Sequence, residues 1–121
     1  MSVAPAGWPD QVRPPGVPDW ERTAVNWLFE ISPPELRGHA ALRRHIVVLA
    51  RFAVLHVEAQ LAAVQRGLSE ARGDLGEVAD LPVVADAVTA FQAEEARLVR
   101  RRREVGLVEA AIRGRRFVAR L

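Results

Sequence analysis

The fold is decided by residues 47–75, which read VVLARFAVLHVEAQLAAVQRGLSEARGDL. Apolar residues recur in this stretch at steps of three and four, the spacing that places them on one side of an α-helix. The members of this series are Val47, Ala50, Val54, Val57, Leu61, Val64, Leu68, Ala71 and Leu75. The stretch therefore predicts a long helix with one continuous apolar side, which we place at residues 40–72.

A second apolar series follows a turn that is marked by Gly73, Gly76 and Pro82. Its members stand seven residues apart: Val84, Phe91, Leu98, Val105 and Ile112. Sevenfold spacing is typical of coiled-coil packing, so residues 83–113 are expected to fold back on residues 40–72 as an antiparallel hairpin. Closure at the turn would pair Val64 with Phe91, Val57 with Leu98 and Ala50 with Val105.

Residues 46–57 are apolar around almost the whole circumference of the predicted helix. Only Arg51 and His56 are strongly polar in this segment. A helix of this kind is normally buried on several sides. We therefore expect other parts of the chain to cover it, and we expect His56 to be a hydrogen-bonded core histidine.

The N-terminal arm, residues 1–18, holds five of the eight prolines and is expected to be extended. Trp8, Val12 and Val17 are spaced so that the arm can dock on a helical surface, because a buried tryptophan removes a large apolar area from water. The arm is therefore expected to be partly docked.

A shorter helix is predicted at residues 19–31, with Asp19 as its N-cap. The sequence Ser32-Pro-Pro-Glu35 has the form of a capping box, so a further helical segment is expected to begin there.

Gly114 is expected to end the second long helix, because glycine is favoured just beyond a helix C-terminus. Residues 114–121 would then be a basic, extended arm. The predicted fold class is all-α: residues 1–121 form one domain with a long antiparallel helical hairpin, a shorter N-terminal helix and extended arms at both ends.

Basic charge is concentrated near the C-terminus. Residues 1–96 hold 8 Arg and 13 acidic residues, whereas residues 97–121 hold 9 Arg and 2 acidic residues. Arginines clustered in this way can bind phosphates without reading the base sequence. The candidates are Arg97, Arg100, Arg101, Arg103, Arg115 and Arg116. The alternative interpretation is a solvated helix side with ion pairs between neighbouring turns.

The sequence lacks the usual equipment of several enzyme classes. It contains no cysteine, so thiolate nucleophiles and thiolate metal sites are excluded. It also contains no His-Glu-x-x-His motif and no glycine-rich phosphate loop, so neither a metal nor a cofactor is expected. One catalytic alternative remains, an anion pocket inside the helices, although the same side chains could simply form internal ion pairs. Its residues would be Arg51, Glu58, Glu94 and Arg101.

The leading functional prediction is a non-catalytic interaction or adaptor module in a larger or self-associated assembly. A two-helix hairpin is thin, and an exposed apolar flank at Leu68, Val88 and Phe91 would favour a protein partner or a second copy. RNA or DNA binding through the arginines is the alternative, and both monomer and dimer stay open. No uninterrupted apolar run reaches about 18 residues, so no membrane span is expected, and the cytoplasm is the expected location.

Overall fold

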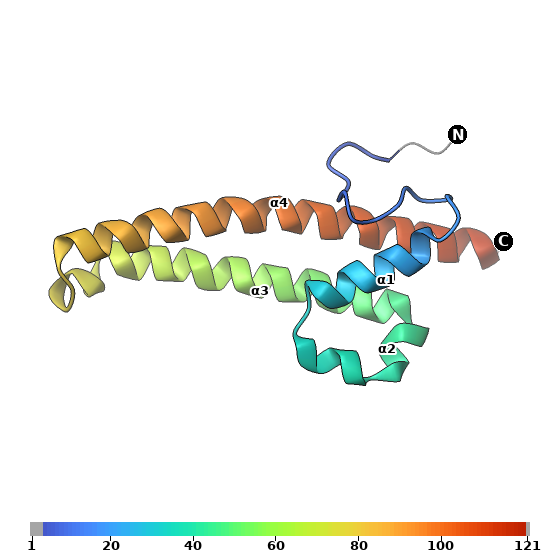
Figure 1. The fold of residues 1–121 in the computed structure, drawn as a ribbon, viewed down its shortest axis with the longest axis horizontal. Coiled ribbons are helices and arrows are strands. Elements are labelled where there is room, and N and C mark those ends of the chain that lie inside the picture. Colours follow the sequence, from blue (N-terminus) through green and yellow to red (C-terminus); the bar gives the residue numbers. More distant parts are fainter. Residues whose placement is uncertain (1–3, 121) are drawn as a thin grey trace. The chain divides into compact units, whose positions relative to one another are not determined.

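Helices α3 (Ile46–Arg72) and α4 (Leu81–Arg120) pack against each other as a helical hairpin (Figure 1). The computed structural model describes residues 4–120, with only the backbone described for residues 115–120. The chain is 77% helical, and the described residues contain no strand. The predicted all-α hairpin is confirmed.

Four shorter elements complete the described chain. They are α1 (Trp20–Glu30), the 3₁₀ helix η1 (Pro34–Gly38), α2 (Ala40–Arg44) and the 3₁₀ helix η2 (Asp74–Glu77). The helix expected over residues 40–72 is divided at His45, where φ is −121° and ψ is 70°, outside the helical region. Two helices therefore stand where the sequence predicted one.

The chain divides into two compact units. Unit 1 consists of Met1–His56 and Arg103–Leu121, and unit 2 consists of Val57–Arg102. Helices α3 and α4 each contribute a segment to both units. Each unit is described by itself below.

The core of unit 1 is built from the apolar side of α1, the first turns of α3 and the C-terminal part of α4 (Figure 1). Its largest fully buried side chains include Trp20, Leu28, Leu49 and Val105. Burying one such side chain completely contributes roughly 1.5–3 kcal/mol relative to leaving it exposed. The short helix α1 is therefore held mainly by packing, because a helix of 11 residues is marginal alone.

The N-terminal arm is docked on unit 1, as expected. Trp8 and Val12 belong to the buried core cluster. The indole Nε1 of Trp8 donates a hydrogen bond to the Val12 carbonyl at 2.8 Å, and its ring centroid lies 6.4 Å from that of Trp20. The arm thus satisfies its own buried donor while it covers α1.

Asp19 is the N-cap residue of α1, as predicted, but neither Asp19 nor Ser32 makes a side-chain capping hydrogen bond. Asp19 has a left-handed backbone with φ of 67° and makes no side-chain cap hydrogen bond. Its carboxylate instead lies 3.7 Å from Arg22 Nη2, and the first turn is closed by the backbone bond from Thr23 N to Asp19 O. Ser32 is buried, its hydroxyl has no hydrogen-bond partner among the described residues, and Pro33 is the residue that precedes η1.

The expected helix end at Gly114 is also wrong. Helix α4 continues through Gly114 to Arg120, so the predicted basic arm is helical over that range. Glycine inside a helix costs roughly 1 kcal/mol relative to alanine. The flanking arginines are good helix formers, and unbroken backbone hydrogen bonding outweighs that cost.

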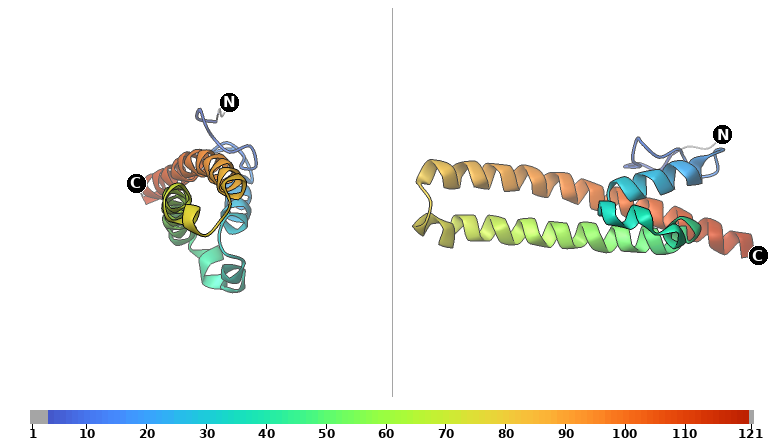
Figure 2. Two further views of the ribbon diagram at one scale, coloured as in Figure 1. Left: turned by 90° about the vertical axis from the view of Figure 1, so that its left-hand side faces the viewer. Right: turned by 60° about the horizontal axis from the view of Figure 1, so that its bottom comes forward.

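Unit 2 contains the remaining parts of α3 and α4, which lie side by side and are joined by η2 (Figure 2). Val57, Leu68, Ala71 and Leu98 are buried there. Phe91 lies against Gly67: a Cβ atom added to Gly67 would stand 3.3 Å from Phe91 Cζ. This contact lies about one turn beyond Val64, the partner that the sequence predicted for Phe91.

Gly67→Val is expected to destabilise the protein by about 1–3 kcal/mol, because the branched side chain would overlap the ring of Phe91. Gly67→Ala should be close to neutral, since the gain of about 1 kcal/mol in helix propensity offsets a slightly tight contact. Urea unfolding measures both effects. Gly76→Ala, where an added Cβ meets nothing within 4 Å, is the control. Equal stability of the valine and alanine variants of Gly67 would contradict the contact.

Candidate interaction surface

The predicted phosphate-binding arginines have different surroundings. Arg97 Nε donates to Glu94 Oε1 at 3.0 Å, so this charge is paired within α4. Arg100 and Arg103 are exposed, and Arg101 is half-buried. The side chains of Arg115 and Arg116 lie outside the described residues. Nucleic-acid binding by this region stays a prediction.

The hydrogen bond from Arg97 lowers the pKa of Glu94, and the positive charges of Arg97 and Arg101 act in the same direction. Arg97→Gln should therefore raise the pKa of Glu94 toward its ordinary value, as followed by NMR titration of the carboxyl carbon. Because the folded pKa is the lower one, the pair stabilises the fold above the unfolded carboxyl pKa and loses this contribution as the pH falls.

Arg100→Gln is the matched control for this titration, since Arg100 is exposed and does not shift Glu94. An unchanged pKa of Glu94 in the Arg97 variant would show that the pair does not persist in solution.

Three of the four residues of the predicted anion pocket, Arg51, Glu58 and Glu94, are paired with side chains outside that set. Arg102 Nε donates to Glu58 Oε2 at 2.9 Å in unit 2, and Arg51 Nη1 lies 3.4 Å from Glu109 Oε1 in unit 1. Glu94 is engaged by Arg97. Within the described residues, no three His, Asp or Glu side chains are grouped so that they could hold a metal ion.

Glu109 is the centre of a charge cluster in unit 1. Its Oε1 faces Arg51 of α3, and its Oε2 lies 3.4 Å from Arg113 Nη2, one turn further along α4. The Glu109 side chain is only 12% exposed. A carboxylate this buried needs paired charges, so the cluster is explained by its role in joining α3 to α4.

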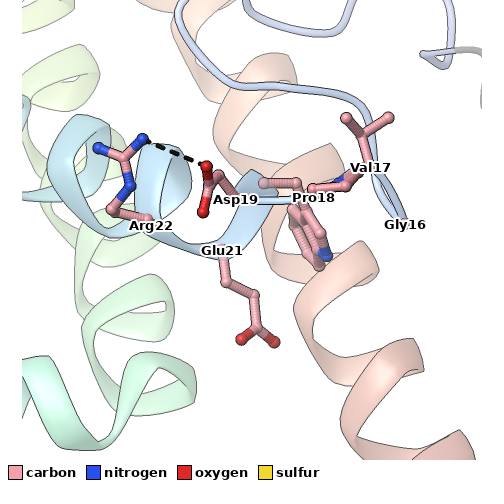
Figure 3. A pocket seen from close by; sticks show the side chains of 7 residues that line it. Gly16, Val17, Pro18, Asp19, Glu21 and Arg22 are labelled. Atoms are coloured by element: carbon pink, nitrogen blue, oxygen red, sulfur yellow. Dashed lines mark ion pairs between the residues drawn. The ribbon is translucent and has the colours of Figure 1, made fainter.

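A shallow pocket lies at the start of α1 and is lined by residues 16–22 (Figure 3). All of its lining comes from this one segment, and two of its charged side chains, Asp19 and Arg22, pair with each other. Small-molecule sites typically have polar groups that converge from different elements. This pocket lacks such a set, because all of its lining comes from one segment.

The strongest surface feature of unit 1 is an exposed apolar row on α3, which we call the α3 row. It consists of Val48, Phe52 and Leu55, which are 55%, 38% and 52% exposed. These residues stand at helical spacing on one side of α3, while Leu49 and Ala53 on the other side are buried. His56 is half-buried, and its ring stacks on that of Phe52 with centroids 6.0 Å apart.

The sequence predicted that residues 46–57 would be covered on several sides, and within the described part of the chain this coverage is incomplete. Helix α1 and the N-terminal arm cover one side of this segment and leave the α3 row open. One sequence signal could have indicated the exposed row: residues 46–57 carry more apolar side chains than a helix packed on one side requires.

Unit 2 exposes a second apolar group, which we call the tip surface. It comprises Leu75, Val78, Leu81 and Val83, in and around η2 and the first turn of α4. Among the side chains that the structure describes, Val78 and Leu81 are the most exposed large apolar ones, at 78% and 81%.

The apolar flank predicted at Leu68, Val88 and Phe91 is only partly present. Leu68 is buried at 7% exposure, so its assignment to an exposed flank is wrong. Val88 and Phe91 are half-buried. The tip surface was not predicted, because the sequence analysis placed Leu75 at the end of the first apolar series and Val83 at the start of the second long helix, and left Val78 and Leu81 in the turn between them.

Among the described helices, α3 is the one that is long and apolar enough to cross a membrane by length and composition alone. Its most apolar 18-residue window has a mean hydropathy of 1.7, and 28% of that window is buried. A core helix of a soluble protein can have the same length and composition.

Comparison of the chain with protein-family models, with curated proteins and with solved structures gave no match.

Proposed function

We propose that this protein is a non-catalytic helical interaction module that binds a protein partner through the α3 row. The observation that carries the proposal is the exposure of Val48, Phe52 and Leu55 along one side of α3 in unit 1. Contiguous exposed apolar side chains of this kind mark interaction sites more often than isolated ones do.

The chemistry of the α3 row suits protein association. Phe52 offers a large apolar ring at the centre of the row, and aromatic anchors often dominate the binding energy of an interface. Val48 and Leu55 flank it one turn away on either side. The row can therefore pack as an i, i+4, i+7 series against another apolar surface.

Phe52→Glu tests the proposal, because it places a charge at the centre of the row. Val99→Glu is the matched control, since Val99 of α4 is exposed to nearly the same fraction, 37% against 38%. Both variants should remain folded by circular dichroism. Proteins captured from cells that make the chain are identified by mass spectrometry, purified and titrated against each variant.

The expected result is a purified partner whose affinity falls at least about tenfold, or about 1.4 kcal/mol, for Phe52→Glu and is unchanged for Val99→Glu. Binding should survive nuclease treatment. Equal affinity for the two variants would overturn the proposal. Loss of binding with nuclease would favour the arginine alternative, and binding only to lipid vesicles would place α3 against a membrane instead.

A further inference from the structure

We propose that the partner of the α3 row is a second copy of this chain, which contributes its tip surface. This inference rests on the function proposed above and adds the identity of the partner. It is carried by the opposite charges that predominate beside two exposed apolar surfaces of the same protein.

The surroundings of the α3 row are mainly basic: the nearest acidic residues in the sequence are Glu35 in η1 and Glu58, one turn beyond Leu55, and Glu58 is paired with Arg102. Residues 36–57 contain four arginines and no acidic residue. Arg37, Arg43 and Arg44, in η1 and α2, are exposed. Arg44 and the exposed His45 directly precede the first turn of α3, where Val48 begins the row. The row is thus an apolar surface with a basic border at its N-terminal end.

Helix α2, which carries two of these arginines, is tied to the core of unit 1. The guanidinium carbon of Arg43 lies 4.7 Å from the ring centroid of Phe29 in α1. A cation over an aromatic ring is attracted by the negative face of the ring. Through this contact, α2 and the arginines of the basic border are held against α1.

The surroundings of the tip surface are mainly acidic: the exposed Arg72, which ends α3 three residues before Leu75, is the nearest basic residue in the sequence. Residues 73–96 contain no arginine, lysine or histidine. Four exposed acidic residues alternate with the apolar residues of the tip surface: Asp74, Glu77, Asp80 and Asp86. The tip surface is therefore apolar with an acidic border.

The α3 row and the tip surface complement each other in two properties: both are apolar, and their borders carry opposite charge. The apolar parts would bury each other, while the charged borders would steer the encounter and reject contacts of a surface with its own copy. An anionic membrane could attract the basic border, but it would repel the acidic tip. A second copy uses both surfaces, through a contact between two different patches of the chain.

Two variants of the full chain test this inference. The row variant combines Arg44→Glu with Phe52→Glu, and the tip variant combines Val78→Arg with Asp80→Arg. Sedimentation velocity over a range of concentrations measures the mass of each protein alone and of their equimolar mixture. Val99→Glu is again the control and should behave like the wild type.

The wild type is expected to self-associate, with an affinity that falls between about 50 and 500 mM salt because exposed charges are screened. Each variant alone should be monomeric, since every copy has lost one half of the contact. Their mixture should form a 1:1 complex, because the row variant keeps an intact tip and the tip variant keeps an intact row.

Three results would overturn the inference. One is a monomeric wild type, one is self-association that the tip variant retains, and one is a mixture that stays monomeric although the wild type associates. In each case the proposed function can still stand, provided that a purified partner loses affinity with Phe52→Glu. If Phe52→Glu changes neither self-association nor partner binding, both proposals fail.

Discussion

Trp20→Ala is expected to lower the free energy of unfolding by about 3–5 kcal/mol, the usual cost of truncating a buried tryptophan. Trp20 is 1% exposed, and its ring packs against Trp8 of the N-terminal arm. The substitution would leave a cavity under α1 and remove the surface on which the arm rests. Domains of this size are stable by about 5–15 kcal/mol, so the loss is a large fraction of the total.

Urea unfolding followed by circular dichroism measures this loss. Phe52→Ala is the control, because it truncates an aromatic residue that is 38% exposed and should cost much less. Similar losses for the two variants would mean that α1 does not pack on the core in solution. Faster proteolysis within residues 4–18 of the Trp20 variant would show that the arm has detached.

Leu98→Ala is expected to cost about 2–5 kcal/mol, because Leu98 is the large buried side chain of α4 in unit 2. Unit 2 consists of two helical segments and a short connection, so few neighbouring side chains can move to fill the cavity. The loss should therefore fall in the upper part of this range.

Val99→Ala is the matched control for Leu98, since it is the next residue on α4 and is exposed. Val99→Ala should change the free energy of unfolding by no more than about 0.5 kcal/mol. Hydrogen exchange should show faster exchange of unit 2 amides in the Leu98 variant. If both variants cost the same, the two long helices do not pack through Leu98.

The hairpin could be predicted from the sequence because helical periodicity specifies which side chains share a side. Val57 and Leu98 belong to the two predicted apolar series, and both are buried. The contact of Phe91 with Gly67 could not be predicted, because the offset between two helices depends on how individual side chains interlock.

The candidate surfaces were less predictable than the helices. Leu68 was expected to be exposed and is buried, whereas Val78 and Leu81 were assigned to a turn and are exposed. The arginines were easy to locate in the sequence, but the pairing of Arg97 with Glu94 is a matter of side-chain geometry.

Local sequence was sufficient to predict two long helices and the turn between them, although not the break at His45 or the C-terminal end of α4, because hydrophobic periodicity acts within each segment. Local sequence did not predict which side of α3 is exposed, since exposure depends on which distant segments reach a given side chain. Helix α1 and the arm bury Leu49 but leave Phe52 in contact with solvent. Burial is a property of the assembled core, and this is why the exposure of the α3 row becomes evident only once the helices are packed.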